Sequence, residues 1–151
     1  MFLLRDYAGY SEDFVGRDVD IRLRSTNGFC EIMLKRKTET AREEISLELN
    51  HNNLENAKEV MKELGCTTAV WMHRLKEIYD YGGIEWSLVI CPENIRYYEA
   101  EIEVTSEDDI SEAEAKIKQE AHKLGLEVLD DDATRELISE LNTKANKLVD
   151  L

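Results

Sequence analysis

Charged and apolar residues alternate along several segments of this chain, and this alternation limits its fold more than any other feature. In Asp20–Arg24 the charged residues alternate with Ile21 and Leu23, and in Glu99–Val104 three glutamates alternate with apolar residues. Successive strand residues point to opposite sides of a sheet, so each segment is predicted to be a strand with one charged and one apolar face. A charged face that carries both signs suits an anion bound together with a metal ion.

Turn residues and helical periodicity divide the rest of the chain into elements. Ser25–Gly28 and Asp80–Gly83 are typical of hairpin turns, because Asn-Gly and Gly-Gly tolerate the positive φ that such turns need. Apolar residues at helical spacing indicate helices in other segments. The expected strands are Val19–Arg24, Phe29–Lys37, Arg42–Leu49, Ala69–Tyr79, Ile84–Ile90 and Arg96–Val104, and the expected helices are about Leu54–Leu64, Ile110–Leu124 and Asp132–Lys147.

Length and charge set the broad class. A chain of 151 residues is predicted to form one domain with its own core. The net charge of -14 argues against nucleic acid or an anionic membrane as a partner, since both would repel the protein. The three cysteines are scattered without a CxxC pair, which fits reduced thiols. With no signal peptide and no apolar run long enough to cross a bilayer, a cytoplasmic location is expected.

Several strand motifs, taken in order, resemble the CYTH superfamily, also called the triphosphate tunnel metalloenzymes. Each motif is short, and the likeness lies in their order and spacing over about Val19–Leu141. The motifs are Asp20-Ile21-Arg22-Leu23-Arg24, Met33-Leu34-Lys35, Arg42-Glu43-Glu44-Ile45, the stretch Arg74–Gly83 and Glu101-Ile102-Glu103-Val104. The resemblance implies an α+β fold: a CYTH-like antiparallel β-barrel that encloses a tunnel, or a strongly curved sheet, with helices on its outer face.

The resemblance also implies which residues form a site. Guanidinium groups match phosphate oxygens, and hard divalent cations prefer carboxylate oxygens. By position, the triphosphate ligands would be Arg22, Arg24, Lys35, Arg42, Arg74 and Lys76. The metal ligands would be Glu101 and Glu103, with Glu44 as a further inward carboxylate, and the metal would be Mg²⁺ or Mn²⁺.

The implied activity is metal-assisted attack on a phosphorus atom of a triphosphorylated small molecule such as ATP, thiamine triphosphate or tripolyphosphate. Water would be the nucleophile in a triphosphatase, and the ribose 3′-hydroxyl would be the nucleophile in a class IV adenylyl cyclase. No catalytic residue is assigned.

Two departures from the family pattern leave alternatives open. Met1–Gly16 lacks the ExExK strand that supplies metal-binding glutamates in the family, and Val89 stands where many members carry an inward acid. We therefore expect a single domain over 1–151 without the family's first strand and helix, with exposed sheet edges that a homodimer could cover. One alternative is a degenerate CYTH module that binds polyphosphate or a protein partner without turnover. Another is a structural domain whose charged face forms only ion pairs.

Overall fold

The computed structural model describes residues 2–14, 19–37, 42–50 and 53–151. In chain order, the elements are β1 (Phe2–Phe14), β2 (Val19–Thr26), β3 (Phe29–Lys37), β4 (Arg42–Leu49), α1 (Leu54–Glu63), β5 (Thr68–Tyr81), β6 (Ile84–Ile90), a short 3₁₀ turn η1 (Pro92–Asn94), β7 (Arg96–Glu101), a second one η2 (Glu107–Asp109), α2 (Ile110–Lys123), α3 (Asp131–Lys144) and β8 (Lys147–Asp150). Within these ranges no helix is long and apolar enough to cross a membrane.

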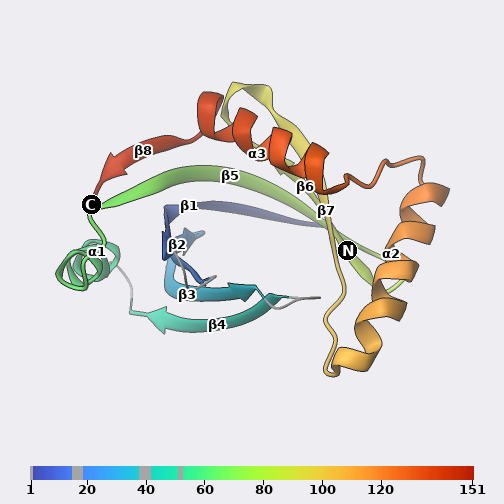
Figure 1. Ribbon diagram of the computed structural model, residues 1–151, viewed down its shortest axis with the longest axis horizontal. Helices are drawn as coiled ribbons and strands as arrows, with labels where there is room; N and C mark the ends of the chain where they lie inside the picture. The colour runs from blue at the N-terminus through green and yellow to red at the C-terminus, as the bar shows by residue number, and fades with distance from the viewer. Residues whose placement is uncertain (1, 15–18, 38–41, 51–52) are drawn as a thin grey trace.

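The strands form an antiparallel sheet that curls into a half-barrel (Figure 1). Along the sheet the order is β4-β3-β2-β1-β5-β6-β7, and β8 pairs with the beginning of β5. Figure 1 shows β3 and β4 curving round beneath β1 and β5, so that the sheet has an inner, concave face and an outer face. The predicted α+β class is confirmed, and the sheet is the curved one of the two forms expected.

Strands β1 and β8 differ from the sequence prediction, which placed no strand before Val19 or after Lys147. β1 lies in the middle of the sheet, where it pairs with β2 on one side and β5 on the other. Polar and apolar residues do not alternate strictly in Phe2–Phe14, so periodicity alone did not reveal this strand. β8 has only four residues, too few to show a period.

Strand β7 is shorter than predicted, because it ends at Glu101 and not at Val104. Among the described strands it pairs with β6, which begins at Ile84 directly after the Gly82-Gly83 turn. Glu101 lies opposite Glu85, so residues beyond Glu101 have almost no partner strand left. Glu103 therefore lies outside the strand row in which it was expected.

The helices cover different faces of the sheet. α1 packs on the outer face, where Leu23 of β2 contacts the cluster that contains Ala57 and Met61. α2 packs on the outer side of β6 through Trp86 and Ala121. α3 lies on the inner side of the same strand, in the last of the three core clusters, which consists of Val89, Cys91, Leu141 and Ala145 with partly buried neighbours.

Val89 of β6 is a buried residue of the inner face. Its side chain is 0% exposed and packs against Leu141 and Ala145 at the end of α3. Lys76 of β5 lies directly opposite Val89, so the apolar cluster under α3 borders the charged part of the inner face.

Candidate functional site: the charged inner face

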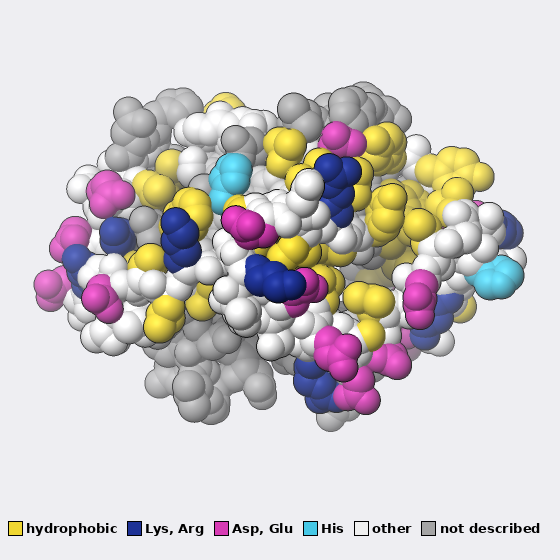
Figure 2. Space-filling view, turned by 90° about the horizontal axis from the view of Figure 1, so that it is seen from above, with side chains coloured by type: hydrophobic (Ala, Val, Ile, Leu, Met, Phe, Trp, Pro, Cys, Tyr) yellow, Lys and Arg dark blue, Asp and Glu magenta, His cyan; other side chains and the backbone are white. Residues whose placement is uncertain are grey.

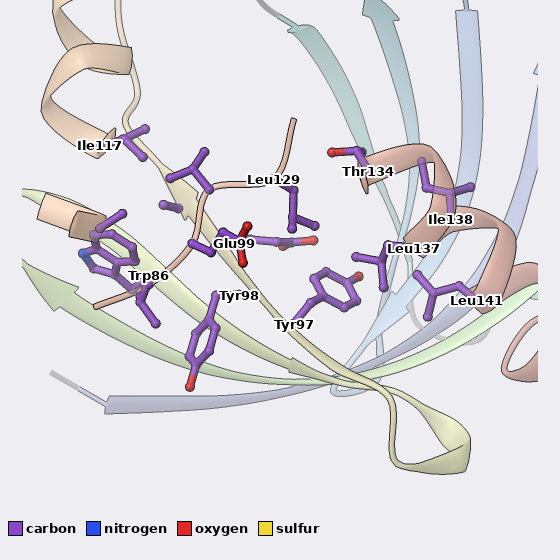
Figure 3. Close-up of a pocket in the computed structure, with 15 residues that line it drawn as sticks. Trp86, Tyr97, Tyr98, Glu99, Ile117, Leu129, Thr134, Leu137, Ile138 and Leu141 are labelled. Atoms are coloured by element: carbon purple, nitrogen blue, oxygen red, sulfur yellow. The ribbon is translucent and has the colours of Figure 1, made fainter. Parts of the chain in front are cut away.

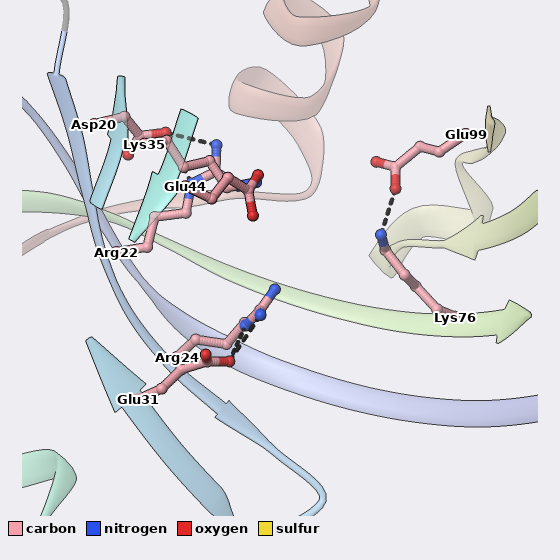
Figure 4. Close-up of polar contacts among 8 residues, drawn as sticks. All are labelled: Asp20, Arg22, Arg24, Glu31, Lys35, Glu44, Lys76 and Glu99. Carbon is pink, nitrogen blue, oxygen red and sulfur yellow. Dashed lines mark hydrogen bonds and ion pairs between the residues drawn. The ribbon is translucent and has the colours of Figure 1, made fainter. Parts of the chain in front are cut away.

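Strand register places the predicted basic residues on one face of the sheet. Asp20 lies opposite Lys35, which in turn lies opposite Glu44. Residues two apart on a strand share a face, so Arg22 and Arg24 lie on the same side as Asp20. Figure 4 shows these side chains projecting from the curved sheet into one interior space.

The basic residues of β5 belong to this same inner face. Arg24 is opposite Gly9 of β1, and Gly9 is opposite Met72 of β5. Arg74 and Lys76 follow Met72 at intervals of two residues, so they share its face. Figure 4 shows Lys76 on a different wall of the curved sheet from Arg22 and Arg24. Arg42 lies opposite Lys37 in the register, but its side chain is outside the described residues.

Four of the predicted phosphate ligands are held in ion pairs with carboxylates of the inner face. Arg22 Nη2 is 2.6 Å from Asp20 Oδ2, and Arg24 Nη2 is 2.7 Å from Glu31 Oε1. Lys35 pairs with Glu44, and Lys76 pairs with Glu99. The basic side chains are only 16–30% exposed, so each positive charge is partly desolvated and locally balanced. Glu31 and Glu99 were not among the predicted site residues, although the alternation of β7 had placed Glu99 in its acidic row.

Arg74 has different surroundings, because it is buried. Its side chain donates from Nη1 to the carbonyl oxygen of His73 at 2.8 Å and from Nη2 to Asn146 Oδ1 at 2.6 Å. Only 2% of the residue is exposed. Asn146 follows the end of α3, so the guanidinium joins β5 to the C-terminal segment across the inner face.

The groups around Arg74 have shifted acidities. Burial, together with the nearby charge of Glu99, raises the pKa of Tyr97 to about 12, although the Arg74 guanidinium opposes the shift. Burial also raises the pKa of the Cys91 thiol, while Arg74 lowers it and Glu99 raises it. Arg74, Cys91, Tyr97 and Glu99 are thus electrostatic neighbours under α3.

The carboxylates predicted to bind a metal do not gather. Glu44 of β4 is paired with Lys35 of β3. Glu101, in contrast, lies at the end of β7 opposite Glu85. Glu101 and Glu103 are both exposed. In the part of the chain that the structure describes, no three His, Cys, Asp or Glu side chains are placed to hold a metal ion. Among the described residues, the predicted metal ligands are therefore not brought to one point.

A pocket that sequence reasoning missed lies beside β7, between α2 and α3 (Figure 3). Its volume is about 380 Å³. Aromatic walls come from Trp86, Tyr97 and Tyr98, and most of the remaining lining is apolar side chains of α2, α3 and the connection between them. Glu99 also lines it, and Figure 3 shows this carboxylate among the labelled pocket residues. The pocket has no linear signal, because its walls come from segments 86–100, 117–129 and 134–141.

The face of the molecule seen in Figure 2 is mixed in charge. Figure 2 shows acidic and basic side chains interspersed, with apolar side chains gathered on the half of the molecule that carries α2. Exposed apolar residues of this region include Tyr98, Leu124, Val128, Leu129 and Ile138. All but Leu124 of these residues also line the pocket.

Comparisons with known proteins cover most of the chain. A family model described as the CYTH domain matches residues 7–135. No curated protein matches the chain. Among solved structures, PH1819 of Pyrococcus horikoshii OT3 superposes with a TM-score of 0.69 at 24% identity, covering 94% of this chain and 88% of that chain.

Two further solved structures share the fold. A candidate adenylate cyclase from Vibrio parahaemolyticus has a TM-score of 0.65 at 12% identity, covering 90% of this chain and 80% of its own. The candidate adenylyl cyclase HpAC1 from Hippeastrum, in which triphosphatase activity is dominant, has a TM-score of 0.55 at 13% identity, covering 88% of this chain and 81% of its own. At these identities the likeness shows the fold.

Proposed function

This chain belongs to the CYTH domain family, and from that premise we propose that it binds a triphosphorylated small molecule on the inner face of its half-barrel. The family is one of metal-dependent proteins that bind triphosphates. The observation that carries the proposal is that Arg22, Arg24, Lys35 and Lys76 come from three strands and project into one concave space.

The ion pairs of the inner face are compatible with this role. Each of these basic groups is paired with a carboxylate, whereas a triphosphate offers several anionic oxygens that can contact more than one guanidinium or ammonium group at once. The incoming phosphates would replace the carboxylates as partners of Arg22, Arg24 and Lys35. Because these side chains are partly buried, the new contacts would be less screened by salt than contacts on an open surface.

Turnover is the second candidate function, as a triphosphatase or an adenylyl cyclase. Membership of the family and the likeness to HpAC1 favour it. A requirement for Mg²⁺ or Mn²⁺ stays a prediction, as do the choice between ATP, thiamine triphosphate and tripolyphosphate, homodimer formation, and the alternative of a binding module without turnover.

Calorimetric titration with tripolyphosphate tests the binding proposal. The double variant Arg22→Ala and Arg24→Ala should bind at least about tenfold more weakly than the wild type, because two charge-assisted contacts are lost. Arg36→Ala is the matched control, since Arg36 neighbours Lys35 on β3 and pairs with Glu43 rather than with an inner-face group. Equal affinity of the double variant and the wild type would refute the inner face as the binding site.

Repeating the titration with Mg²⁺ and with Mn²⁺ separates the two candidate functions. Tighter binding with either ion, together with release of phosphate or pyrophosphate from ATP, would support an enzyme. Binding that neither ion improves, without any product, would support a module that binds polyphosphate without turnover.

A further inference from the structure

Arg74 differs from the other basic residues of the inner face, because its hydrogen-bond acceptors are uncharged. The other four described basic residues each form an ion pair with a carboxylate. Arg74 donates instead to the carbonyl oxygen of His73 and to Oδ1 of Asn146. A buried guanidinium that is held by neutral oxygens keeps a positive charge that an anion would stabilise.

The end of α3 and the residues just after it cover this guanidinium. Asn146 follows the helix and is joined to it by a hydrogen bond of 2.7 Å from its Nδ2 to Asn142 Oδ1. Leu141 packs close by, in the cluster that contains Val89. Arg74 is only 2% exposed, so a ligand on the inner face cannot reach its guanidinium while α3 and Asn146 keep this position.

The contacts that hold α3 are few enough for the helix to shift. Of its 14 residues only Leu141 is buried, and Leu137 is partly buried beside Tyr97 (Figure 3). Residues 126–130, which precede the helix, form neither helix nor strand. Elements with few buried apolar contacts open at a smaller free energy than the core does. Because β8 pairs directly with β5, the segment after α3 would stay attached during such a shift.

A phosphate group would compete with Asn146 for the same guanidinium. Arg74 and Lys76 are two residues apart on β5, so they share the inner face. A phosphate oxygen carries negative charge, whereas Asn146 Oδ1 is neutral, so phosphate makes the stronger hydrogen bonds to a guanidinium. A triphosphate can shift α3 because it gains the contact with Arg74 only when the helix end has moved away.

We propose that α3 and Asn146 form an autoinhibitory latch: Asn146 occupies Arg74 in the free protein, and a triphosphate on the inner face displaces it. This inference rests on the proposed function and adds the regulation of that site. The ion-paired residues on β2, β3 and β5 would make the first contacts with the ligand, and Arg74 would join them once the latch has opened.

Two substitutions at Asn146 test the latch by calorimetric titration with tripolyphosphate. Asn146→Ala removes the competing acceptor, so the affinity should rise about fivefold. Asn146→Asp gives Arg74 a charged partner that phosphate must displace, so the affinity should fall about fivefold. A residue with a merely structural role would not change the affinity in opposite directions in these two variants.

Asn142→Ala and Asn142→Asp are the matched controls. They make the same two chemical changes one helical turn earlier, at an exposed residue that bonds to Asn146 and not to Arg74. An added charge on an exposed side chain is screened by salt, so the affinity for tripolyphosphate should change less than about twofold in either control.

Hydrogen exchange of the backbone amides gives a second readout that uses the wild type. Saturating tripolyphosphate should speed exchange in α3, because the bound state holds the latch open, and it should leave α1 on the outer face unchanged. Unchanged or slower exchange in α3 on binding would refute the latch, even if Asn146→Ala does not fold.

The outcomes separate this inference from the proposed function. If the wild type binds tripolyphosphate and the two Asn146 variants bind it equally well, or both more weakly, the latch is wrong and the inner-face site stands. If neither the wild type nor Asn146→Ala binds, both the latch and the proposed function are wrong. Binding by Asn146→Ala alone would support a latch that keeps the wild type closed.

Discussion

At the scale of single residues, carboxylates of the inner face occupy the basic side chains that a phosphate would need under the proposed function. Arg24 and Glu31 show it most simply, because their ion pair joins directly opposed residues of β2 and β3. A partly exposed pair of this kind contributes little to stability. Its main effect is to occupy a guanidinium that a phosphate could use.

Replacing Glu31 with Gln should therefore strengthen tripolyphosphate binding. Measured pairs of this type are worth less than about 1 kcal/mol, so the expected gain in affinity is roughly two- to fivefold by calorimetry without metal. Glu43→Gln is the control, because Glu43 pairs with Arg36 away from the inner face. A loss of affinity in Glu31→Gln would mean that this carboxylate contributes to binding rather than competing with it.

Tyr97 should make the protein sensitive to alkaline pH. Its pKa is about 12 in the folded protein against an ordinary value of 10.0, so the unfolded chain loses this proton first. Stability should be unaffected below pH 10.0 and should fall as pH rises from there to about 12, by on the order of 2 kcal/mol. Denaturant unfolding of Tyr97→Phe at several alkaline pH values should show a smaller loss than the wild type. Identical losses would show that Tyr97 titrates normally.

The buried guanidinium of Arg74 predicts a role for Asn146 in stability. Asn146→Ala removes the oxygen that accepts from Nη2 at 2.6 Å and leaves a buried charged donor with one partner fewer. The expected loss is about 1–3 kcal/mol in the free energy of unfolding. Asn142→Ala is the matched control, because it removes only an exposed hydrogen bond between Asn142 and Asn146. Equal losses for the two variants would contradict the importance of Arg74.

At the scale of elements, α3 is the helix that closes one side of the inner face. Its start is capped by Asp130, whose Oδ1 accepts from the backbone N–H of Ala133 at 2.8 Å. Its other end is fixed by Leu141, which packs on Val89 of β6. The position of α3 decides how much of the β6 and β7 surface remains available to a ligand.

Shortening Leu141 should loosen this helix. Leu141→Ala leaves a cavity next to Val89 and Cys91 and should cost about 2–5 kcal/mol in denaturant unfolding. Leu148→Ala serves as the control, since Leu148 is 77% exposed and should tolerate the change. A loss for Leu141→Ala as small as that of the control would show that α3 is not held by this cluster.

At the scale of the whole molecule, a net charge of -14 surrounds a concave face that carries the predicted phosphate ligands. The overall charge slows the approach of a polyanion, whereas the local basic groups favour it once it is inside. The binding energy of such a polyanion must therefore come from short-range contacts with basic side chains of the inner face. The folded half-barrel brings these side chains together from β2, β3 and β5.

The curved sheet itself should be stabilised by the ligand, because only the folded state brings these strands together. Tripolyphosphate at about 100 times its dissociation constant should add roughly 2.7 kcal/mol to the free energy of unfolding and raise the melting temperature. The double variant Arg22→Ala and Arg24→Ala, which should bind at least about tenfold more weakly, should gain no more than about 1.4 kcal/mol at the same concentration. If the melting temperature of the wild type does not move, the charged face forms only internal ion pairs.

The sequence by itself determined the elements that alternate or repeat. Strands β3, β4 and β6 lie where alternation placed them, because a half-buried strand needs a polar and an apolar face in strict turn. The same alternation predicted one charged face for the sheet, and the register brings the basic residues of β2, β3 and β5 to one side.

Only the tertiary structure decided which charges meet and which are covered. Glu31 and Glu99 pair with Arg24 and Lys76 because of strand register and curvature, neither of which can be read from a single segment. Arg74 is buried because α3 and the residues after it cross the sheet far along the chain. The pocket beside β7 and the central strand β1 likewise depend on contacts between distant segments. The spacing of apolar residues within one segment does not predict such contacts.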